Sequence, residues 1–302
     1  MRVIANRFQR TLAGPAAVAG VGFITGARVV ARFRPAPPDT GVVFRRIDLG
    51  GAPAVPARAE RVSGTQRRTT LGPPDAGVTL VEHVLAALAG GRIDNCVVEL
   101  DGPEPPGLDG SAAAFTAAIT AAGAVTQSAQ RPIYAVSESV VVRAPGATLA
   151  IHPAAGTDLR VSYRLDYGPG APLAPQSHTV TVNPASFARD LAACRTFLTE
   201  PEAAGLRAQG VGRHLSAADL LVFGRRGPIG NAVRFADEPA RHKILDLIGD
   251  LALCGFDLAG HVVAYRSGHA LNVELARALS AAAADSRKSS SRKVVTSVRL
   301  AA

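Results

Sequence analysis

EPARHKILDLIGDLALC, residues 238–254, is the most strongly helical stretch of the sequence. Its apolar side chains form one stripe along such a helix, made by Ile244, Leu247, Ile248 and Leu251. At about 100° per residue, the polar side chains His242, Asp246 and Asp250 fall within about 80° of one another on the opposite side. The pattern predicts an amphipathic helix that packs its apolar stripe against another layer of the protein.

The polar stripe of this helix has two interpretations. His242 and Asp246 are separated by four positions, and this spacing lets an imidazole and a carboxylate reach one metal ion. The alternative is an ordinary solvent-facing side of an amphipathic helix. Residues 238–254 alone leave both interpretations open.

A second helix start resembles this one. Residues 82–90, EHVLAALAG, and residues 241–249, RHKILDLIG, each place a histidine at the start of an apolar helix that leads towards a strand. The likeness indicates either a duplicated α/β unit or a chance similarity between two leucine-rich helices. The sequence does not decide between them.

The rest of the chain alternates strand and helix patterns. In residues 28–34, apolar Val29, Ala31 and Phe33 alternate with arginines, as is typical of a half-buried strand. Polar residues 124–132 predict the boundary between two domains. The expected strands cover 28–34, 41–49, 95–100, 133–143, 147–151, 159–167 and 261–266, and the expected helices cover 79–90, 112–122, 238–254 and 270–284.

Length and composition exclude several classes of protein. The chain has 302 residues, which suggests two domains, and 47% hydrophobic residues, which excludes a disordered chain. No apolar run reaches the ~18 residues of a membrane span. Residues 11–24 are interrupted by glycine and proline, so we expect no cleaved signal peptide. Three widely spaced cysteines without a CxxC pair favour a reducing, cytoplasmic compartment.

The charge of the chain says little about a nucleic-acid partner. Its net charge is +9, and only three of its 33 basic residues are lysines. Residues 285–302 hold five basic residues and one acidic residue, so the body of the protein is only mildly basic. Because the body is only mildly basic, we expect no nucleic-acid partner. The charge would still attract a small anionic ligand such as a phosphate ester.

Residues from both halves of the chain combine into a candidate catalytic metal site. A catalytic zinc needs three protein ligands and one open position, and His83, His242 and Asp246 would make such a set. Glu82, next to a ligand, has the chemistry of a general base acting on water.

A candidate proton donor lies at a second place in the sequence. Arg266-Ser-Gly-His269 follows a predicted strand and precedes a predicted helix. A histidine at such a turn is suited to donate a proton, and Asp250 is its candidate orienting partner. Lys243 is the only lysine before the tail, and it stands beside a candidate ligand.

Taken together, these segments resemble the zinc-dependent UDP-3-O-acyl-N-acetylglucosamine deacetylases of lipid A biosynthesis, the LpxC family. The matching segments follow one another along nearly the whole chain. They are RPAPPDTGVVFRR (34–46), VEHVLAALAG (81–90), IDNCVVELDGPEPPGLDGSAAAF (93–115), RTF (195–197), RFADEPARHKILDLIGDLALCG (234–255) and SGHALN (267–272).

The resemblance implies an α+β fold of two similar α/β sandwich domains, with helices packed between the two sheets. We expect an N-terminal domain over 1–128 with an insert near 42–71, and a C-terminal domain over 129–284 with an insert near 187–222. Residues 285–302 are expected to be a loose basic tail. The active site would lie between the domains.

The resemblance also implies a role for each site residue. One zinc ion per chain would be held by His83, His242 and Asp246. The catalytic residues would be Glu82 as general base, His269 as general acid or electrostatic partner, Asp250 as the partner of His269, and Thr196 as a stabiliser of the oxyanion. The substrate contacts would be Lys243, Phe197, Arg266, Asp166 and Tyr167, with Arg266 in place of the usual lysine before SGH.

The implied reaction removes the N-acetyl group of UDP-3-O-acyl-N-acetylglucosamine, giving the free amine and acetate. The implied partner is that UDP-linked acylated amino sugar, bound by a cytoplasmic monomer without stable membrane insertion. Two alternatives stay open: a zinc amidohydrolase acting on a different acylated amino sugar, and a basic, non-enzymatic RNA-binding α/β protein.

Two segments depart from the family pattern. The usual GLHSG segment reads Gly22-Phe-Ile-Thr-Gly26, with Ile24 in place of histidine. In the second insert, Arg213 and His214 stand where relatives have a glycine-rich, apolar segment of the acyl passage. Their polar ends either reach water at the mouth of the passage and leave it open, or cap and shorten it. Because two bulky polar residues replace glycine space, we expect them to cap it.

Overall fold

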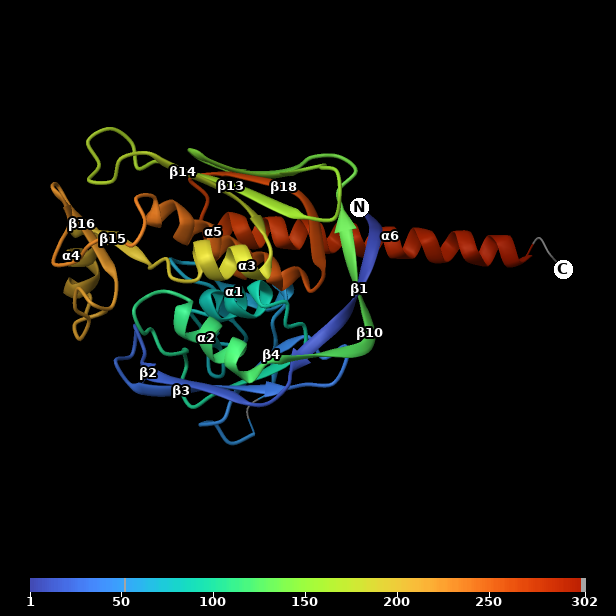
Figure 1. Ribbon diagram of the computed structural model, residues 1–302, viewed down its shortest axis with the longest axis horizontal. Coiled ribbons are helices and arrows are strands. Elements are labelled where there is room, and N and C mark those ends of the chain that lie inside the picture. Colours follow the sequence, from blue (N-terminus) through green and yellow to red (C-terminus); the bar gives the residue numbers. More distant parts are fainter. Residues whose placement is uncertain (52, 300–302) are drawn as a thin grey trace.

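Two β-sheets enclose a layer of helices (Figure 1). The structure, a computed structural model, describes residues 1–51 and 53–299, with side chains for 1–51 and 53–286. Helices α1 (Glu82–Gly90) and α5 (Glu238–Leu251) pack against each other in the middle layer. This arrangement confirms the expected α+β sandwich with helices between two sheets.

The first sheet carries the N-terminal half of the core. Its strand order is β2-β3-β9-β4-β5, and Val29, Ala31 and Phe33 of β3 face inward as the alternation predicts. Its strands are β2 (Ala16–Val21), β3 (Arg28–Pro35), β4 (Val42–Arg46), β5 (Val55–Pro56) and β9 (Cys96–Leu100).

The second sheet is built around β18 (Asp257–Tyr265), the last strand of the chain. β18 pairs antiparallel with β12, and parallel with β13 and β10. The other strands are β1 (Arg2–Leu12), β10 (Ala124–Ala135), β11 (Val140–Ala144), β12 (Ala147–His152), β13 (Leu159–Leu165) and β14 (Gln176–Val182).

The two halves repeat one topology. In the first sheet, β9 follows helix α1 and lies between an antiparallel neighbour, β3, and a parallel neighbour, β4. In the second, β18 follows helix α5 and lies in the same way between β12 and β13. The outer strands β2 and β5 correspond to β11 and β14. The likeness between residues 82–90 and 241–249 therefore marks a duplicated α/β unit.

One glycine sets how closely the two central helices approach. A Cβ atom on Gly249 of α5 would lie 2.1 Å from the backbone oxygen of Glu82, the first residue of α1. Glycine at this position lets the backbones touch, which brings the starts of the two units together. The remaining helices are α2 (Ala113–Ala122), α3 (Pro184–Ser186), α4 (Glu200–Ala208) and α6 (His269–Arg299), with short helical turns at Ala59–Arg61, Phe187–Leu191 and Ala252–Cys254.

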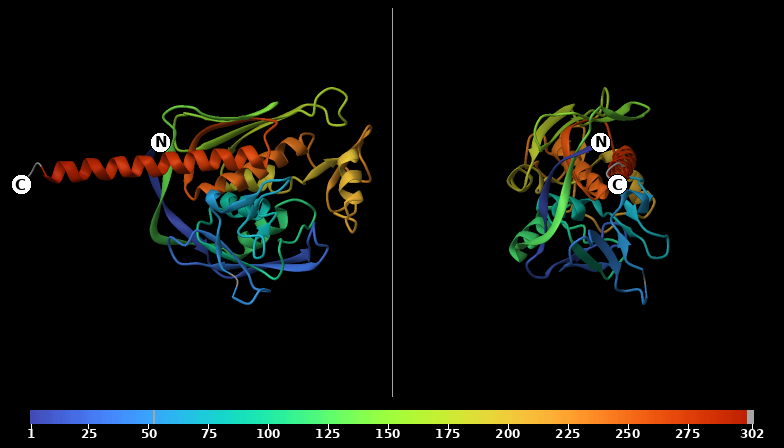
Figure 2. Two further views of the ribbon diagram at one scale, coloured as in Figure 1. Left: turned by 180° about the vertical axis from the view of Figure 1, so that it is seen from behind. Right: turned by 90° about the vertical axis from the view of Figure 1, so that its right-hand side faces the viewer.

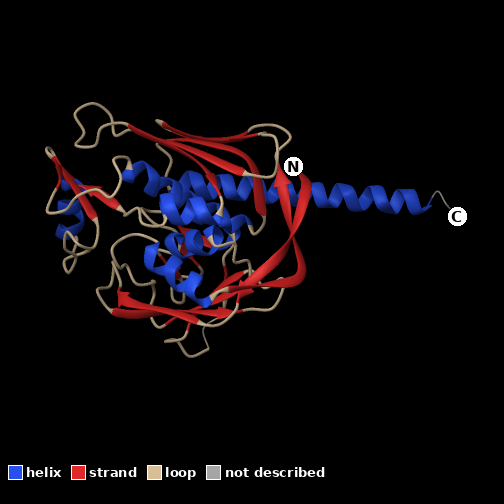
Figure 3. Cartoon of the chain, viewed as in Figure 1, coloured by secondary structure: helices blue, strands red, loops and turns tan. Residues whose placement is uncertain are grey.

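Residues 124–132, where we expect the domain boundary, form part of a strand. These residues belong to β10, which pairs with β1 in a long antiparallel ribbon that runs between the two layers (Figure 3). Much of the ribbon is exposed, so its strands carry polar residues and lack the apolar alternation of a buried strand. Because β10 runs through residues 128 and 129, the division of the chain at that point stays a prediction.

The two inserts are small sheets, with bounds that differ from those expected. β4 and β5, inside the expected insert 42–71, belong to the main first sheet because β4 pairs with β9. The small sheet of the first insert holds β6 (Val62–Gly64), β7 (Thr70–Leu71) and β8 (Val78–Thr79). The second insert holds α4 with β15 (Phe197–Thr199), β16 (Leu221–Gly224) and β17 (Gly227–Pro228).

Residues 285–299, part of the expected loose tail, continue the last helix of the structure. α6 continues to Arg299 and runs out beyond the two sheets (Figure 2). Between His269 and Arg299 the chain has no glycine or proline to end the helix. None of the described helices is long and apolar enough to cross a membrane.

Candidate active site

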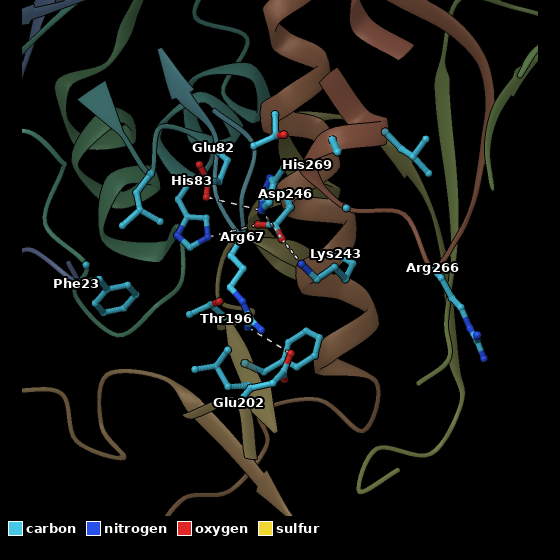
Figure 4. A pocket seen from close by; sticks show the side chains of 18 of the residues that line it. Phe23, Arg67, Glu82, His83, Thr196, Glu202, Lys243, Asp246, Arg266 and His269 are labelled. Carbon is cyan, nitrogen blue, oxygen red and sulfur yellow. Dashed lines mark hydrogen bonds and ion pairs between the residues drawn. The ribbon is translucent and has the colours of Figure 1, made fainter. Parts of the chain in front are cut away.

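A pocket of about 490 Å³ opens where the two repeated units meet. The first unit contributes the start of α1 and loops that carry Phe23 and Arg67. The second contributes β15, α5 and the start of α6 (Figure 4). The pocket therefore gathers most of the predicted site residues, as the resemblance implies for a site between two domains.

The predicted metal ligands lie together at this pocket: His83 and Asp246 line it, and buried His242 lies against Asp246. The Nε2 atoms of His83 and His242 are 3.5 Å and 3.3 Å from Oδ1 of Asp246. One ligand atom from each of the three residues lies within 4.8 Å of the others. His242 and Asp246 are buried in the protein, so the solvent-facing interpretation of this helix side is wrong.

The His242 ring is held in the state that a metal needs. Its Nδ1 lies 3.0 Å from the carbonyl oxygen of Cys194, a contact that places the proton on Nδ1 and leaves the Nε2 lone pair facing Asp246. Burial, together with nearby His83 and Lys243, lowers the pKa of His242 to about 4 against the pull of Asp246. The imidazole is therefore neutral near pH 7, as metal binding requires.

Asp246 is kept ionised inside the protein. Burial alone would raise the pKa of this carboxyl, but His242 and Lys243 outweigh it and hold the pKa well below its usual range. Nζ of Lys243 donates to Oδ2 of Asp246 over 2.7 Å, while Oδ1 faces the two histidines. The carboxylate thus offers one oxygen to a cation and the other to lysine.

Glu82 is a buried carboxyl beside the metal ligands. Its Oε2 accepts a hydrogen bond from the backbone N–H of Thr69 over 3.0 Å, and its Oε1 lies 3.9 Å from Nε2 of His269. Burial raises the pKa of Glu82, and the nearby histidines oppose that rise. A carboxylate of raised pKa is suited to accept a proton from water.

His269, at the start of α6, is oriented by Asp250. Its Nδ1 lies 2.9 Å from Oδ2 of Asp250, which also accepts a hydrogen bond from Asn272 over 2.9 Å. The hydroxyl of Thr69 donates to the other oxygen of Asp250 over 2.6 Å. Burial would lower the pKa of His269, but Asp250 and Glu82 outweigh it and raise the pKa to about 9. Near pH 7 His269 is a cation that can give up a proton.

Thr196 lines the pocket opposite this group. Its backbone is fixed on both sides, because its N–H donates to the carbonyl of Gly110 over 2.7 Å and its own carbonyl accepts from Leu221 over 3.0 Å. The preceding residue, Arg195, forms a buried ion pair of 2.8 Å with Glu238, the first residue of α5. This pair ties the threonine to the helix that carries the metal ligands.

Phe197 and Lys243 form the next wall of the pocket. The Phe197 ring meets the His242 ring edge to face at 6.2 Å, and Nζ of Lys243 lies 5.7 Å from the Phe197 ring centre. Tyr167 packs against the same phenylalanine at 6.2 Å. The three predicted substrate contacts therefore lie side by side.

Arg266 and Asp166 lie farther from the metal group. Arg266 lines the pocket, but its side chain points away from the histidines (Figure 4). Its guanidinium pairs with Asp166 over 3.0 Å, and Asp166 itself does not line the pocket. The structure thus separates these two from the other predicted residues.

Sequence reasoning missed the carboxylate that shapes one wall. Glu104 is fully buried and accepts hydrogen bonds from the backbone N–H groups of Ile24 and Thr25. These bonds fix the turn from which Phe23 reaches the pocket. A Cβ atom on Gly107 would lie 2.2 Å from the Phe23 ring, so glycine there makes room for it. The available signal is an acidic residue flanked by prolines in the proline- and glycine-rich loop 101–110.

Arg213 and His214 do not line this pocket. Arg213 is exposed, and its Nε donates to the carbonyl of Arg207 over 3.4 Å. Nε2 of His214 lies 2.9 Å from the carbonyl oxygen of Gly22, which links the second insert to the turn beside Phe23. The expectation that both residues cap the acyl passage stays a prediction, because the described pocket does not reach them.

Known proteins match this chain over most of its length. The family described as LpxC, UDP-3-O-acyl N-acetylglycosamine deacetylase, matches residues 9–281. A UDP-3-O-acyl-N-acetylglucosamine deacetylase of Thermosynechococcus vestitus is 42% identical over 90% of this chain and 93% of its own length. Proteins of the same name from Myxococcus xanthus and Citrifermentans bemidjiense are 41% and 40% identical, over 89% of this chain and 85% and 87% of their own. The chain therefore belongs to the LpxC family of UDP-3-O-acyl N-acetylglycosamine deacetylases.

Proposed function

We propose that this chain hydrolyses the N-acetyl group of UDP-3-O-acyl-N-acetylglucosamine with the help of one zinc ion bound by His83, His242 and Asp246. As an LpxC deacetylase, the chain is a hydrolase of lipid A biosynthesis. The observation that carries the residue assignment is that these three ligands lie together beside Glu82 and His269, at a pocket that His83, Asp246, Glu82 and His269 line.

The donor set fits zinc. Two imidazole nitrogens and one carboxylate oxygen are ligands that zinc prefers, and three protein ligands leave a fourth position open. When bound, zinc lowers the pKa of water and polarises the amide carbonyl. The hydrogen bond from His242 to Cys194 and the contact of Lys243 with Asp246 would orient two of the ligands.

The remaining residues divide the proton transfers between them. Glu82 accepts the proton of the attacking water, because its carboxylate is held beside the ligands by Thr69. The C–N bond of the amide then breaks, acetate leaves with the water oxygen, and the amine takes its proton from the acid His269. Asp250 stabilises the protonated form of His269 and fixes its ring.

The other pocket residues would bind the substrate. Thr196 lies where it can stabilise negative charge on the carbonyl oxygen, an effect that is large in a preorganised site. Lys243, Phe197 and Tyr167 would hold the sugar and nucleotide, and the Arg266–Asp166 pair would meet the UDP end. We further propose a cytoplasmic monomer that binds neither nucleic acid nor the interior of a membrane.

Acetate release from purified protein tests the function directly. UDP-3-O-acyl-N-acetylglucosamine is the expected substrate, and a panel of other acylated amino sugars is the comparison. Faster release from another member of the panel would favour the alternative amidohydrolase. Elemental analysis of the purified protein, and reactivation of stripped protein with zinc or iron, identifies the metal.

A further inference from the structure

Arg67 reaches into the pocket from the small sheet of the first unit. It lines the pocket, and Figure 4 shows its side chain extending from the metal group towards Glu202. Its backbone φ is 58°, a left-handed conformation that costs energy for a residue other than glycine. The fold thus holds Arg67 at the pocket in a backbone conformation that is unfavourable for arginine.

The partner of Arg67 is weaker than those of the other pocket cations. Lys243 pairs with Asp246 over 2.7 Å and Arg266 with Asp166 over 3.0 Å, whereas Nη1 of Arg67 is 3.3 Å from Oε1 of Glu202. The Arg67 side chain is also 54% exposed, against 22% for Lys243 and 34% for Arg266. An exposed ion pair of this kind contributes little and is readily exchanged.

Glu202 keeps its place without Arg67. Its other oxygen, Oε2, accepts hydrogen bonds from the backbone N–H and the hydroxyl of Thr199, over 2.9 Å and 2.8 Å. These bonds form the cap of α4, so the carboxylate is fixed by its own helix. Arg67 is therefore the member of the pair that is free to move.

We propose that Arg67 leaves Glu202 when the substrate enters and binds its diphosphate. This inference rests on the proposed function, because a UDP sugar carries its charge on the diphosphate. A guanidinium can bind two phosphate oxygens through two parallel N–H groups. In the contact with Glu202, Arg67 uses only one nitrogen, Nη1, at 3.3 Å. Arg67 also lies within electrostatic reach of Tyr167, a predicted nucleotide contact.

Binding of UDP, measured by calorimetry on the zinc-loaded full chain, tests this role. Arg67→Met keeps the length of the side chain and should raise the Kd for UDP about 10- to 100-fold, the worth of a charged hydrogen bond. Glu202→Gln should lower that Kd, because the competing charge is gone while an acceptor for Thr199 remains. In acetate release, Arg67→Met should raise KM and leave kcat nearly unchanged.

Arg68→Ala is the matched control. It removes the same charge from the next residue, whose Nε donates to Thr79 over 2.9 Å and which does not line the pocket. A Kd for Arg67→Met within twofold of wild type, or an equal rise in Arg68→Ala, would overturn the proposal. If Arg67→Met folds poorly, Arg67→Lys replaces it, with a smaller rise expected because one ammonium replaces the fork. Wild-type protein that binds UDP but releases no acetate would refute the function and not this role.

Discussion

The two repeated units deliver their histidines to the metal group in different ways. In α5, His242 is the fifth helical residue, its side chain is 1% exposed, and its ring is held by Cys194. In α1, His83 is the second helical residue and is 12% exposed. It follows Leu80, whose φ is 57°, by three positions. One ligand is therefore positioned by regular helix geometry, and the other by a turn that the rest of the fold imposes.

Removing the three metal ligands one at a time should have the largest effect on metal content and activity, and it compares the two histidines directly. His83→Ala, His242→Ala and Asp246→Ala should each lose the bound metal and nearly all activity, because a three-ligand site cannot spare one. His242→Ala should also lower the free energy of unfolding more than His83→Ala does, by about 1–3 kcal/mol, since it leaves a buried carbonyl unpaired. Elemental analysis and urea unfolding measure the two effects. His152→Ala, whose ring contacts Ser139 outside the site, is the control. Full metal content in all three variants would refute the site.

Glu82 and His269 separate proton transfer from metal binding. Glu82→Gln and His269→Ala should retain the metal and lose about 10²- to 10⁴-fold in kcat, the usual scale for a missing base or acid. Glu99→Gln, which alters a carboxylate paired with Arg34 on the first sheet, should leave kcat unchanged. A kcat near that of wild type in either site variant would exclude that residue from proton transfer.

Asp250→Asn should move the pH profile. The negative charge of Asp250 favours protonated His269, so its removal lowers the pKa of that histidine from its raised value of about 9. As the acid, His269 works below its pKa, so the basic limb of kcat should shift to lower pH by about 1–3 units. Profiles of kcat against pH for wild type, Asp250→Asn and the surface variant Asp219→Asn measure this. An unmoved basic limb would mean that another group sets it.

Gly249→Ala and Gly205→Ala compare two helical glycines. At Gly249 the new methyl group would meet the backbone of Glu82, so the variant should lose about 1–3 kcal/mol of unfolding free energy and some kcat. At Gly205 in α4, nothing lies within 4 Å, so alanine should stabilise by about 0.5–1 kcal/mol. Urea unfolding of both proteins gives the values, and equal stabilities would show that α1 and α5 do not need their close contact.

The sequence predicted the parts of the site that depend on local geometry. His242 and Asp246 could be paired because helix periodicity places them together, and His269 could be placed because a strand and a helix flank it. Thr69, Arg67 and Glu104 could not be predicted, since they lie in loops and each has a partner 79 to 181 positions away in sequence. Only the folded chain brings Thr69 to Glu82 and Asp250.

The sequence predicted the strands that have one buried face. It did not predict the strands whose two faces are both partly exposed. β3 shows a clear alternation because Val29 and Phe33 face the core. β10 is half of a partly exposed ribbon, so residues 124–132 are polar and predict a domain boundary and not a strand. The pairing of β1 with β10 joins residues that are more than 100 positions apart, such as Arg2 and Ala135. No local sequence pattern encodes such a pairing.

The central place of β18 has a consequence for protein synthesis. Because the chain is made from its N-terminus, the first sheet and the α1 helix leave the ribosome long before residues 257–265. The second sheet cannot form its central strand pairs until β18 has been made. β1 is connected to β18 only through β10. His269 follows directly. A nascent chain that ends before residue 257 therefore lacks the central strand of the second sheet and His269, and it leaves part of its second core uncovered.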